Sequence, residues 1–459
     1  MPVPVEFQAV VLAAGKGSRM LEITSGHPKC LLPVGPKPLI WYTLRKLQIT
    51  GFNEAILIVL ETQKAEIQSA IERELEGNSL DIKVDYVSIA EDQEDLGTAD
   101  SLRLVQERLK SDVLVVSCDL VSDVNLGGVL NLFRKHNASI ASLMFYHQAS
   151  EPIVVPGPKS KHKPEKDLIG IDEQTQRLVF MASVSDFESQ VTLPLSLLKK
   201  HTLVKMYSTL IDSHVYVLKN WVIQYLKSER SITSLKGELI PYIVKKQLSK
   251  PQKIDEVNQS IINTKDSNDI FSFAEEDELE LAIREISSFN DHNGDLKSSY
   301  NNDPIRCYAY IAPKGSIGLR VNTLPAYWSI NGKIQEVWNK VSINMSLIQK
   351  SPQANIQSNQ VDDKCIISDG AKLNEKTSFK NANIGTNTTV NSFSRVFNSI
   401  VMNNVMIHEK VALENCIVCD NAVIEKGSSL KNCIVGNNHL VQAESECTNE
   451  LLTEDLMHF

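Results

Sequence analysis

The residues that could do chemistry begin in a glycine-rich segment near the N-terminus. Residues 12–20 read Leu-Ala-Ala-Gly-Lys-Gly-Ser-Arg-Met and follow directly on the apolar run 7–13. Glycines in such a turn let the backbone approach a phosphate, and the N–H groups of the turn can hold it. The candidate contacts are Gly15, Gly17, Ser18 and the forked donor Arg19. The segment predicts a phosphate-binding loop, although an ordinary strand-to-helix turn can have the same composition.

Three further motifs follow in order along the chain. Residues 28–34 read Pro-Lys-Cys-Leu-Leu-Pro-Val and would bring Lys29 to the same pocket. Gly97 and Thr98 open a helical stretch and would offer a backbone surface to a nucleobase or ribose. Asp119 follows the apolar run 112–117, where a carboxylate could bind Mg²⁺. Each motif alone is compatible with packing or capping, but together they favour one nucleotide or phosphate pocket.

The elements that must position these residues are short apolar runs separated by helical patterns. The apolar runs are 7–13, 55–60 and 112–117, and helical patterns include 39–50 and 100–110. This alternation predicts an α/β domain with a mostly parallel sheet over residues 1–250. Ligands of such sheets bind beyond the carboxyl ends of the strands.

The composition changes after residue 250. Residues 251–303 are rich in Asn, Ser, Asp and Glu, with an acidic run at 275–280, and are interpreted as a linker with one short helix at about 274–286. Residues 304–350 are expected to form a connecting segment.

Apolar residues then recur at every sixth position. One series is Val361, Ile367, Leu373 and Phe379, and the next is Ile384, Val390 and Val396. A third is Ile400, Met406, Ala412, Val418, Ile424 and Leu430, beside which run Val405, Val411, Ile417, Val423, Ser429, Val435 and Val441. A step of six predicts a β-helix of hexapeptide repeats over residues 351–445, with irregular coils where the phase slips near 380 and 400, and a tail at 446–459.

Charge, hydropathy and cysteine spacing argue against a nucleic-acid-binding protein, a membrane or secreted protein, and a zinc protein. The net charge of -9 argues against direct binding of nucleic acid. No apolar run approaches the length of a membrane span, and the first four residues do not resemble a secretory signal, so we expect a cytosolic protein with no membrane partner. The pair Cys416 and Cys419, with Cys433 and Cys447 downstream, is interpreted as packing within the repeat and not as a zinc site.

The four motifs together resemble the sugar-nucleotide pyrophosphorylase family. Its members share Leu-Ala-Ala-Gly-x-Gly-Thr-Arg, Pro-Lys-x-Leu-x-Pro-Val, Gly-Thr-Ala and an Asp at a strand end. The resemblance implies a nucleotidyltransferase-like, Rossmann-like mixed sheet followed by a left-handed parallel β-helix. In this family a sugar-1-phosphate attacks a nucleoside triphosphate, while Mg²⁺, Arg and Lys neutralise the phosphates.

Two departures from the enzyme pattern put this activity in doubt. The segment that contacts the sugar as Glu-Lys-Pro in the family reads Arg-Leu-Val-Phe-Met-Ala at residues 177–182. The strand that should supply a second metal-binding Asp contains Asp212 but lacks the small residues that make room for the sugar. The pocket is therefore expected to be vestigial, with no catalytic residue and no cofactor, and with Asp119 and Asp212 only as vestigial metal candidates.

The departures match a narrower group, the gamma-subunit family of eukaryotic translation initiation factor 2B. The similar segments include residues 37–42, 97–103, 117–120, 178–182, 231–234, 238–242, 306–308 and 419–427. The resemblance implies a non-catalytic subunit of the guanine-nucleotide exchange complex for initiation factor 2, partnered by the epsilon, alpha, beta and delta subunits. Because the sequence stops at Phe459 without the helical-repeat domain of epsilon, little exchange activity is expected from it alone.

Two enzymatic readings stay open. One is an active pyrophosphorylase, for example one that makes GDP-mannose. The other is a hexapeptide-repeat acyltransferase, which would need a His facing a cleft between coils, with His408 and His439 as candidates. A lone His in a β-helix is more often an exposed corner residue.

Overall fold

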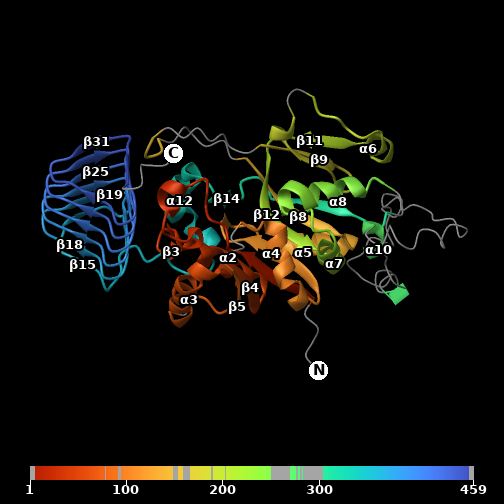
Figure 1. The fold of residues 1–459 in the computed structure, drawn as a ribbon. Coiled ribbons are helices and arrows are strands. Elements are labelled where there is room, and N and C mark those ends of the chain that lie inside the picture. The colour runs from red at the N-terminus through yellow and green to blue at the C-terminus, as the bar shows by residue number, and fades with distance from the viewer. Residues whose placement is uncertain are drawn as a thin grey trace, which may run out of the picture.

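The computed structural model describes residues 6–77, 79–90, 95–147, 154–158, 166–187, 190–201, 203–249, 269–274, 278–279, 282 and 303–453. They form a mixed α/β domain and a β-helix, with helix α12 (Leu324–Val341) between the two (Figure 1). The predicted fold class is confirmed. Among the described residues, no helix has the length and apolar character needed to cross a membrane.

A seven-stranded sheet organises the first domain. Its order is β13-β8-β12-β6-β1-β4-β5. The strands are β1 (Phe7–Leu12), β4 (Glu54–Leu60), β5 (Lys83–Ile89), β6 (Asp112–Ser117), β8 (Ile140–Tyr146), β12 (Leu210–Leu218) and β13 (Cys307–Ile311). All neighbours are parallel except β12, which runs antiparallel to both β6 and β8. The three apolar runs seen in the sequence are the adjacent strands β6, β1 and β4.

Both faces of this sheet are buried, which explains the continuous apolar runs. Successive side chains of a strand point to opposite faces. Accordingly Ala9 and Val11 belong to one apolar core and Val10 to the other. The helices are α2 (Leu39–Thr50), α3 (Glu61–Glu76), α4 (Thr98–Val105), α5 (Gly127–His136), α7 (Asn220–Ser228) and α8 (Ile240–Lys246). Buried residues of α2, α3 and α5 line the first core, and those of α4, α7 and α8 line the second.

The segment after the linker completes the first domain before the chain reaches the β-helix. The expected connection at 304–350 contributes the edge strand β13, which pairs with β8. It also contributes β14 (Gly318–Arg320), which pairs with β7 (Leu120–Ser122). The chain then passes through α12 and the residues that follow it into the β-helix. Most of the predicted linker and its expected helix lie outside the described residues, although α10 (Ile270–Phe273) packs against the second core.

A smaller antiparallel sheet stands beside the large one. Its order is β10-β9-β11, from β9 (Asp167–Asp172), β10 (Leu178–Ser183) and β11 (Val204–Tyr207). Arg177 precedes β10 and is fully buried, with its Nη2 2.8 Å from Asp303. The segment that departs from the enzyme pattern is therefore anchored to the end of the linker.

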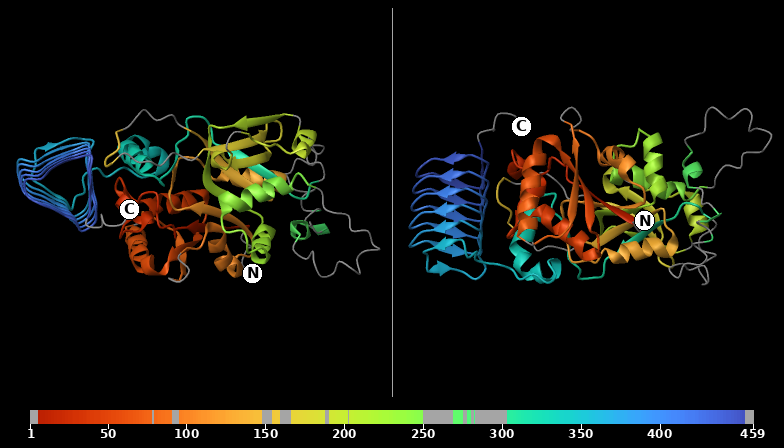
Figure 2. Two further views of the ribbon diagram at one scale, coloured as in Figure 1. Left: turned by 45° about the horizontal axis from the view of Figure 1, so that its top comes forward. Right: turned by 90° about the horizontal axis from the view of Figure 1, so that it is seen from below.

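The repeats form a β-helix of three six-stranded parallel sheets. Its triangular outline and its stacked coils are visible in the two views of Figure 2. One sheet contains β15 (Asn355–Ile356), β18 (Lys372–Leu373), β21 (Thr389–Val390), β24 (Met406–Ile407), β27 (Val423–Ile424) and β30 (Leu440–Val441). The second contains β16 (Gln360–Val361), β19 (Ser378–Lys380), β22 (Arg395–Phe397), β25 (Ala412–Glu414), β28 (Ser429–Lys431) and β31 (Glu446–Thr448). The third contains β17 (Ile366–Ile367), β20 (Asn383–Ile384), β23 (Ile400–Val401), β26 (Ile417–Val418), β29 (Ile434–Val435) and β32 (Leu451–Leu452).

The coils are one residue shorter than three exact hexapeptides. At one corner, Asn381, Asn398, Asn415, Asn432 and Asn449 stack in a ladder of side-chain amide bonds, each 17 positions after the last. Because a coil has 17 residues and not 18, a residue series with a constant step of six shifts by one position in each coil and moves between inward-facing and outward-facing sites. Ile400, Met406 and Ala412, which begin the third series, face outward, while their neighbours Val401, Ile407 and Leu413 fill the core. The β-helix also continues to Leu452, beyond the expected end at residue 445.

One outer face of the β-helix is covered. Ile366, Ile400, Ile417 and Ile434 belong to the first apolar core together with buried residues of α12. The Asn331 amide of α12 bridges the two domains, since its Oδ1 accepts from Gly35 N–H at 2.9 Å and from Asn383 Nδ2 at 3.1 Å. Apolar packing and these two hydrogen bonds therefore join the β-helix to the first domain through α12.

Candidate functional site

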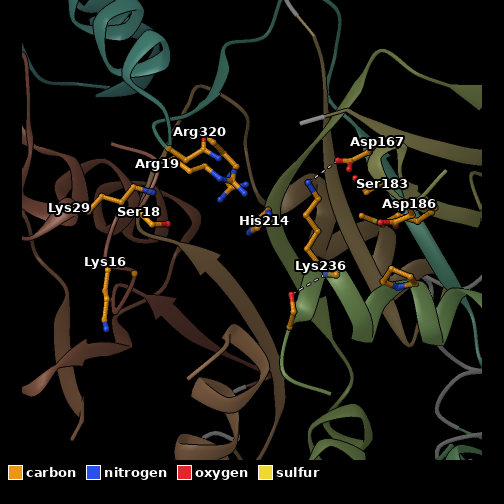
Figure 3. A pocket seen from close by; sticks show the side chains of 18 residues that line it. Lys16, Ser18, Arg19, Lys29, Asp167, Ser183, Asp186, His214, Lys236 and Arg320 are labelled. Carbon is orange, nitrogen blue, oxygen red and sulfur yellow. Dashed lines mark hydrogen bonds and ion pairs between the residues drawn. The ribbon is translucent and has the colours of Figure 1, made fainter. Parts of the chain in front are cut away.

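A cavity of about 510 Å³ opens beyond the carboxyl end of β1. The glycine-rich loop and Lys29 form one side, and the opposite side comes from β10, β12 and the π-helical turn η5 (Leu235–Leu239) (Figure 3). Of the eight residues proposed from the sequence, five line the cavity: Gly15, Gly17, Ser18, Arg19 and Lys29. The predicted loop and the predicted lysine thus share one pocket.

The loop reaches its shape through one glycine with a left-handed backbone. Gly17 has φ +72°, and a Cβ at this position would lie 2.9 Å from Cγ2 of Thr24. The Thr24 hydroxyl in turn donates to the Met20 carbonyl at 3.0 Å. A side chain at position 17 would be strained and would collide with Thr24. The chain therefore turns sharply enough for Ser18 and the exposed Arg19 to face the cavity.

Asp119 lies beneath the cavity, where β6 ends beside the loop. It is 1% exposed, and its Oδ2 accepts a 2.5 Å bond from Lys29 Nζ. Arg320 on β14 donates to the same carboxylate from Nη2 at 3.3 Å and from Nε at 3.4 Å. Burial would raise the pKa of Asp119, but the charges of Arg320 and Lys29 and hydrogen bonds from Lys29 and Ser117 hold it well below its usual range.

Asp212 is held in a different way. It is completely buried on β12, accepts a hydrogen bond from the Tyr216 hydroxyl and accepts the His214 N–H at 3.1 Å. Burial raises the pKa of this carboxyl in spite of these bonds and of the charges of Lys236 and Arg320. Asp212 does not line the cavity as Arg320 and His214 do.

The two carboxylates do not fit a magnesium site. Mg²⁺ needs octahedral oxygen ligands at close range. The oxygens of Asp119 already accept from two cations, and those of Asp212 accept from Tyr216 and from the backbone. A divalent cation at Asp119 would also face the positive charges of Lys29 and Arg320. Within the described residues, no group of three or more His, Cys, Asp or Glu side chains could hold a metal ion.

His214 lies in the wall of the cavity, two residues after Asp212 on β12. Its backbone has φ +55°, at an irregularity in the pairing of β12 with β8. Burial lowers the pKa of the ring well below its usual value, and the charge of Arg320 lowers it further, so the ring is neutral. Its Nε2 is buried and has no hydrogen-bond partner in the described part of the chain.

The far wall contains the segment that departs from the enzyme pattern. Met181 and Ala182, at the end of the segment 177–182, line the cavity together with Ser183. Lys236 extends across this wall and lies 2.9 Å from Asp167 (Figure 3).

Gly97 and Thr98 do not reach the cavity. A Cβ at Gly97 would lie 2.1 Å from the Thr233 carbonyl oxygen, and the Ala99 N–H donates to that oxygen at 2.9 Å. The Thr98 hydroxyl accepts the Leu235 N–H at 2.9 Å. The backbone surface that the sequence suggested for a nucleobase or ribose is therefore packed against residues 233–235.

The repeat domain shows no second candidate site at the predicted histidines or cysteines. His408 and His439 lie at opposite ends of strands in one sheet, with the strand β27 between those strands. Cys416, Cys419 and Cys433 are fully buried, and the Cys416 thiol donates to the carbonyls of Glu414 and Leu430.

Sequence reasoning missed Arg320 and Lys236 and did not assign a role to His214. Arg320 lies 201 positions after Asp119, beyond the linker, and no local motif marks it. Arg320 is the basic residue at the end of the short run 318–320, but this run reaches the cavity only by pairing with β7, about 200 positions earlier in the chain.

Comparison with known proteins assigns the two domains and the family. Residues 8–153 match the nucleotidyl transferase family, and residues 371–450 match the GlmU-like C-terminal hexapeptide family. The chain is 32% identical over 390 residues to translation initiation factor eIF2B subunit gamma of Schizosaccharomyces pombe, covering 83% of this chain and 74% of that protein. It is 32% identical over 246 residues to the protein of the same name from Caenorhabditis elegans, covering 53% of this chain and 59% of that protein.

A related subunit is also similar. Translation initiation factor eIF2B subunit epsilon of Schizosaccharomyces pombe is 26% identical over 218 residues, covering 46% of this chain and 31% of that protein. The two gamma subunits named above match over a longer part of the chain and at higher identity than this epsilon subunit. The chain therefore belongs to the gamma-subunit family of translation initiation factor eIF2B.

Proposed function

We propose that the chain is a non-catalytic subunit of the cytosolic guanine-nucleotide exchange complex that reloads translation initiation factor 2 with GTP. The observation that carries this proposal is the 32% identity with a gamma subunit over 390 residues, a stretch long enough to include both domains. In this role the chain holds its partner and helps bind the substrate factor, and it makes or breaks no covalent bond.

The proposed direct partner is an epsilon subunit. The similarity to an epsilon chain over 218 residues supports two related chains that pair within one complex. The alpha, beta and delta subunits of the same complex, and initiation factor 2 as the substrate GTPase, complete the proposed set of partners. No nucleic acid is included, in keeping with the net charge of -9.

The arrangement of the two aspartates supports the non-catalytic assignment. Phosphoryl transfer depends on positioned cations, with metal ions that neutralise the developing charge. Asp119 is held by Lys29 and Arg320, and Asp212 by Tyr216, so neither carboxylate is available as a ligand in this arrangement. The chain keeps the loop of a transferase without an available metal-binding pair.

The second candidate is an active sugar-1-phosphate nucleotidyltransferase of the GDP-mannose type. It is favoured by the nucleotidyl transferase match over residues 8–153 and by the loop that lines the cavity. Release of pyrophosphate from GTP and mannose 1-phosphate with Mg²⁺ distinguishes the two. An active enzyme would turn over at about 1–10³ per second, whereas we expect no release above background.

The proposed partnership is tested by co-expression with an epsilon subunit and size-exclusion chromatography. We expect the two chains to co-elute as one complex. Separate elution of two folded chains would count against the proposed function, as would pyrophosphate release at an enzymatic rate.

A further inference from the structure

Exposed apolar side chains concentrate in one stretch of the first domain. Among the described residues, Val184, Val191, Leu195, Leu198 and Leu203 are each between 40% and 64% exposed. This stretch contains helix α6 (Leu195–Lys200) and ends where β11 begins. Single exposed apolar side chains are ordinary, but a cluster of them is typical of a surface that another molecule covers. The concentration at α6 therefore indicates a contact with another molecule.

Helix α6 carries leucines on two opposite sides. Leu197 is fully buried and packs with Val179 and Leu248, so this side attaches the helix to the domain. Leu195 and Leu198 lie about one turn apart on the other side and are 64% and 55% exposed. A helix with apolar residues on opposite sides is normally covered on both. The outward side of α6 therefore has the composition of a contact surface.

The strand that follows α6 has an open edge. In the part of the chain that the structure describes, β11 pairs with β9 alone and is the last strand of the small sheet. Leu203 leads into β11 and is 49% exposed. An open strand edge beside exposed leucines promotes aggregation unless another element covers it. A partner bound at α6 would shield both features.

A cation lies on the same side of α6 as the two exposed leucines. Lys199 is exposed, one helical turn after Leu195, and forms no ion pair or hydrogen bond with the described residues. Its neighbour Lys200 is engaged by Asp303 at 2.8 Å. We call Leu195, Leu198 and Lys199 the α6 face. An apolar centre with an unpaired positive charge at its rim fits a partner surface that is apolar with an acidic residue at its edge.

We propose that the α6 face binds an epsilon subunit, and that the epsilon surface in contact with it is apolar with an acidic residue opposite Lys199. The identity of the partner rests on the proposed function, whereas the choice of this face rests on the burial and charge of α6. Helix α6 lies at the end of the first domain that is far from the β-helix (Figure 1). A partner bound there leaves the uncovered faces of the β-helix free for other subunits.

A second apolar surface lies on the β-helix but is the weaker candidate. On the sheet that contains β24 and β30, Met406 and Leu440 point outward and are 37% and 48% exposed. These side chains are less exposed than the two leucines of the α6 face. Leu440 therefore serves as the rival site in the test.

The test measures binding of the full chain to a full-length epsilon subunit by biolayer interferometry. The double variant Leu195→Glu with Leu198→Glu keeps a good helix former at both positions and brings two carboxylates into the proposed contact. We expect its Kd to be at least about thirtyfold higher than that of the wild type, because central apolar contacts contribute most of the binding energy of an interface. Lys199→Glu should slow association, since it places a negative charge opposite the acidic residue of epsilon.

Two control variants make the test specific to the α6 face. Leu104→Glu replaces a leucine of α4 that is 41% exposed, and Leu440→Glu replaces the leucine of β30 that is 48% exposed. Both should bind epsilon with a Kd within about threefold of the wild-type value. Circular dichroism and urea unfolding check that each variant folds.

The assignment is overturned if the double variant binds epsilon as tightly as Leu104→Glu does, or if Leu440→Glu is the variant that loses binding. Either result leaves the proposed function standing, because the wild type still binds epsilon. If the wild type itself does not bind, the proposed partner and the α6 assignment fail together. If the double variant does not fold, Lys199→Glu decides: slower association supports the α6 face, and an unchanged association rate overturns it.

Discussion

Replacing Asp119 by Asn should destabilise the protein substantially, because the carboxylate acts as a structural counterion. Asp119 is 1% exposed, and the side chains of Lys29 and Arg320 that it binds are 11% and 14% exposed. Removing one partner of a buried ion pair leaves an uncompensated charge and costs about 3–5 kcal/mol. Because Asn keeps the shape and one acceptor, we expect the lower end, about 3 kcal/mol.

The assay is urea-induced unfolding followed by circular dichroism, with Asp85→Asn as the control. Asp85 pairs with Arg108 at an exposed site, and its loss should change the free energy of unfolding by less than about 1 kcal/mol. If Asp119 were an open metal-ligand carboxylate, its neutralisation would leave stability unchanged or raise it. Such a result for Asp119→Asn would refute the counterion role and the argument against a magnesium site.

The same variant has a defined pH dependence. The pKa of Asp119 lies well below its ordinary value of 3.8, so the carboxylate stabilises the fold at every pH above that value. The stabilisation is lost only as the pH falls from about 4 toward the folded-state pKa. The stability difference between the wild type and Asp119→Asn should therefore be constant from neutral pH down to about pH 5 and shrink in stronger acid.

Two further predictions concern the contact between the domains. Burial lowers the pKa of His27, but the hydrogen bond and charge of Asp420 on the β-helix and the charge of Glu66 outweigh burial and raise the pKa above 6.5. The stabilisation of the fold by the His27–Asp420 pair should therefore be complete below pH 6.5 and be lost as the pH rises through the folded-state pKa. Thermal melts of His27→Gln should lack this pH dependence. Ile417→Ala removes a fully buried side chain from the face against α12 and should lower the free energy of unfolding, measured in urea, by about 2–5 kcal/mol. Val423 is partly exposed and points outward, so the control Val423→Ala should change the same free energy by less than about 1 kcal/mol.

Local signals in the sequence located the central strands of the sheet and one side of the cavity. The strands β1, β4 and β6 are continuous apolar runs because both faces of the sheet are covered, and such runs are visible without a structure. The loop at 15–19 and Lys29 could be placed in one pocket because parallel strands end at the same edge.

What the sequence did not reveal depends on pairing between distant segments. Arg320 reaches Asp119 only because β14 pairs with β7, and β13 joins the large sheet only because the chain returns after the linker. Gly97 was interpreted as a ligand contact, but the close approach it permits is that of the Thr233 backbone. A glycine that allows close approach does not show what approaches.

The repeat gives a third lesson. A step of six is the local spacing between corners, and it predicted the β-helix correctly. The coil is 17 residues long, because one corner of each coil is a residue shorter. Counting by sixes therefore groups Ile400 with Val418, although Ile400 faces α12 and Val418 fills the core.

The most direct test of the central claim is the release of fluorescent GDP from initiation factor 2. The assay compares this chain alone, an epsilon subunit alone and the two together. The proposed role predicts that the pair is clearly faster than epsilon alone and that this chain alone leaves the rate near its uncatalysed value. If epsilon alone is as fast as the pair, the assignment of this chain to the exchange complex as a supporting subunit is contradicted.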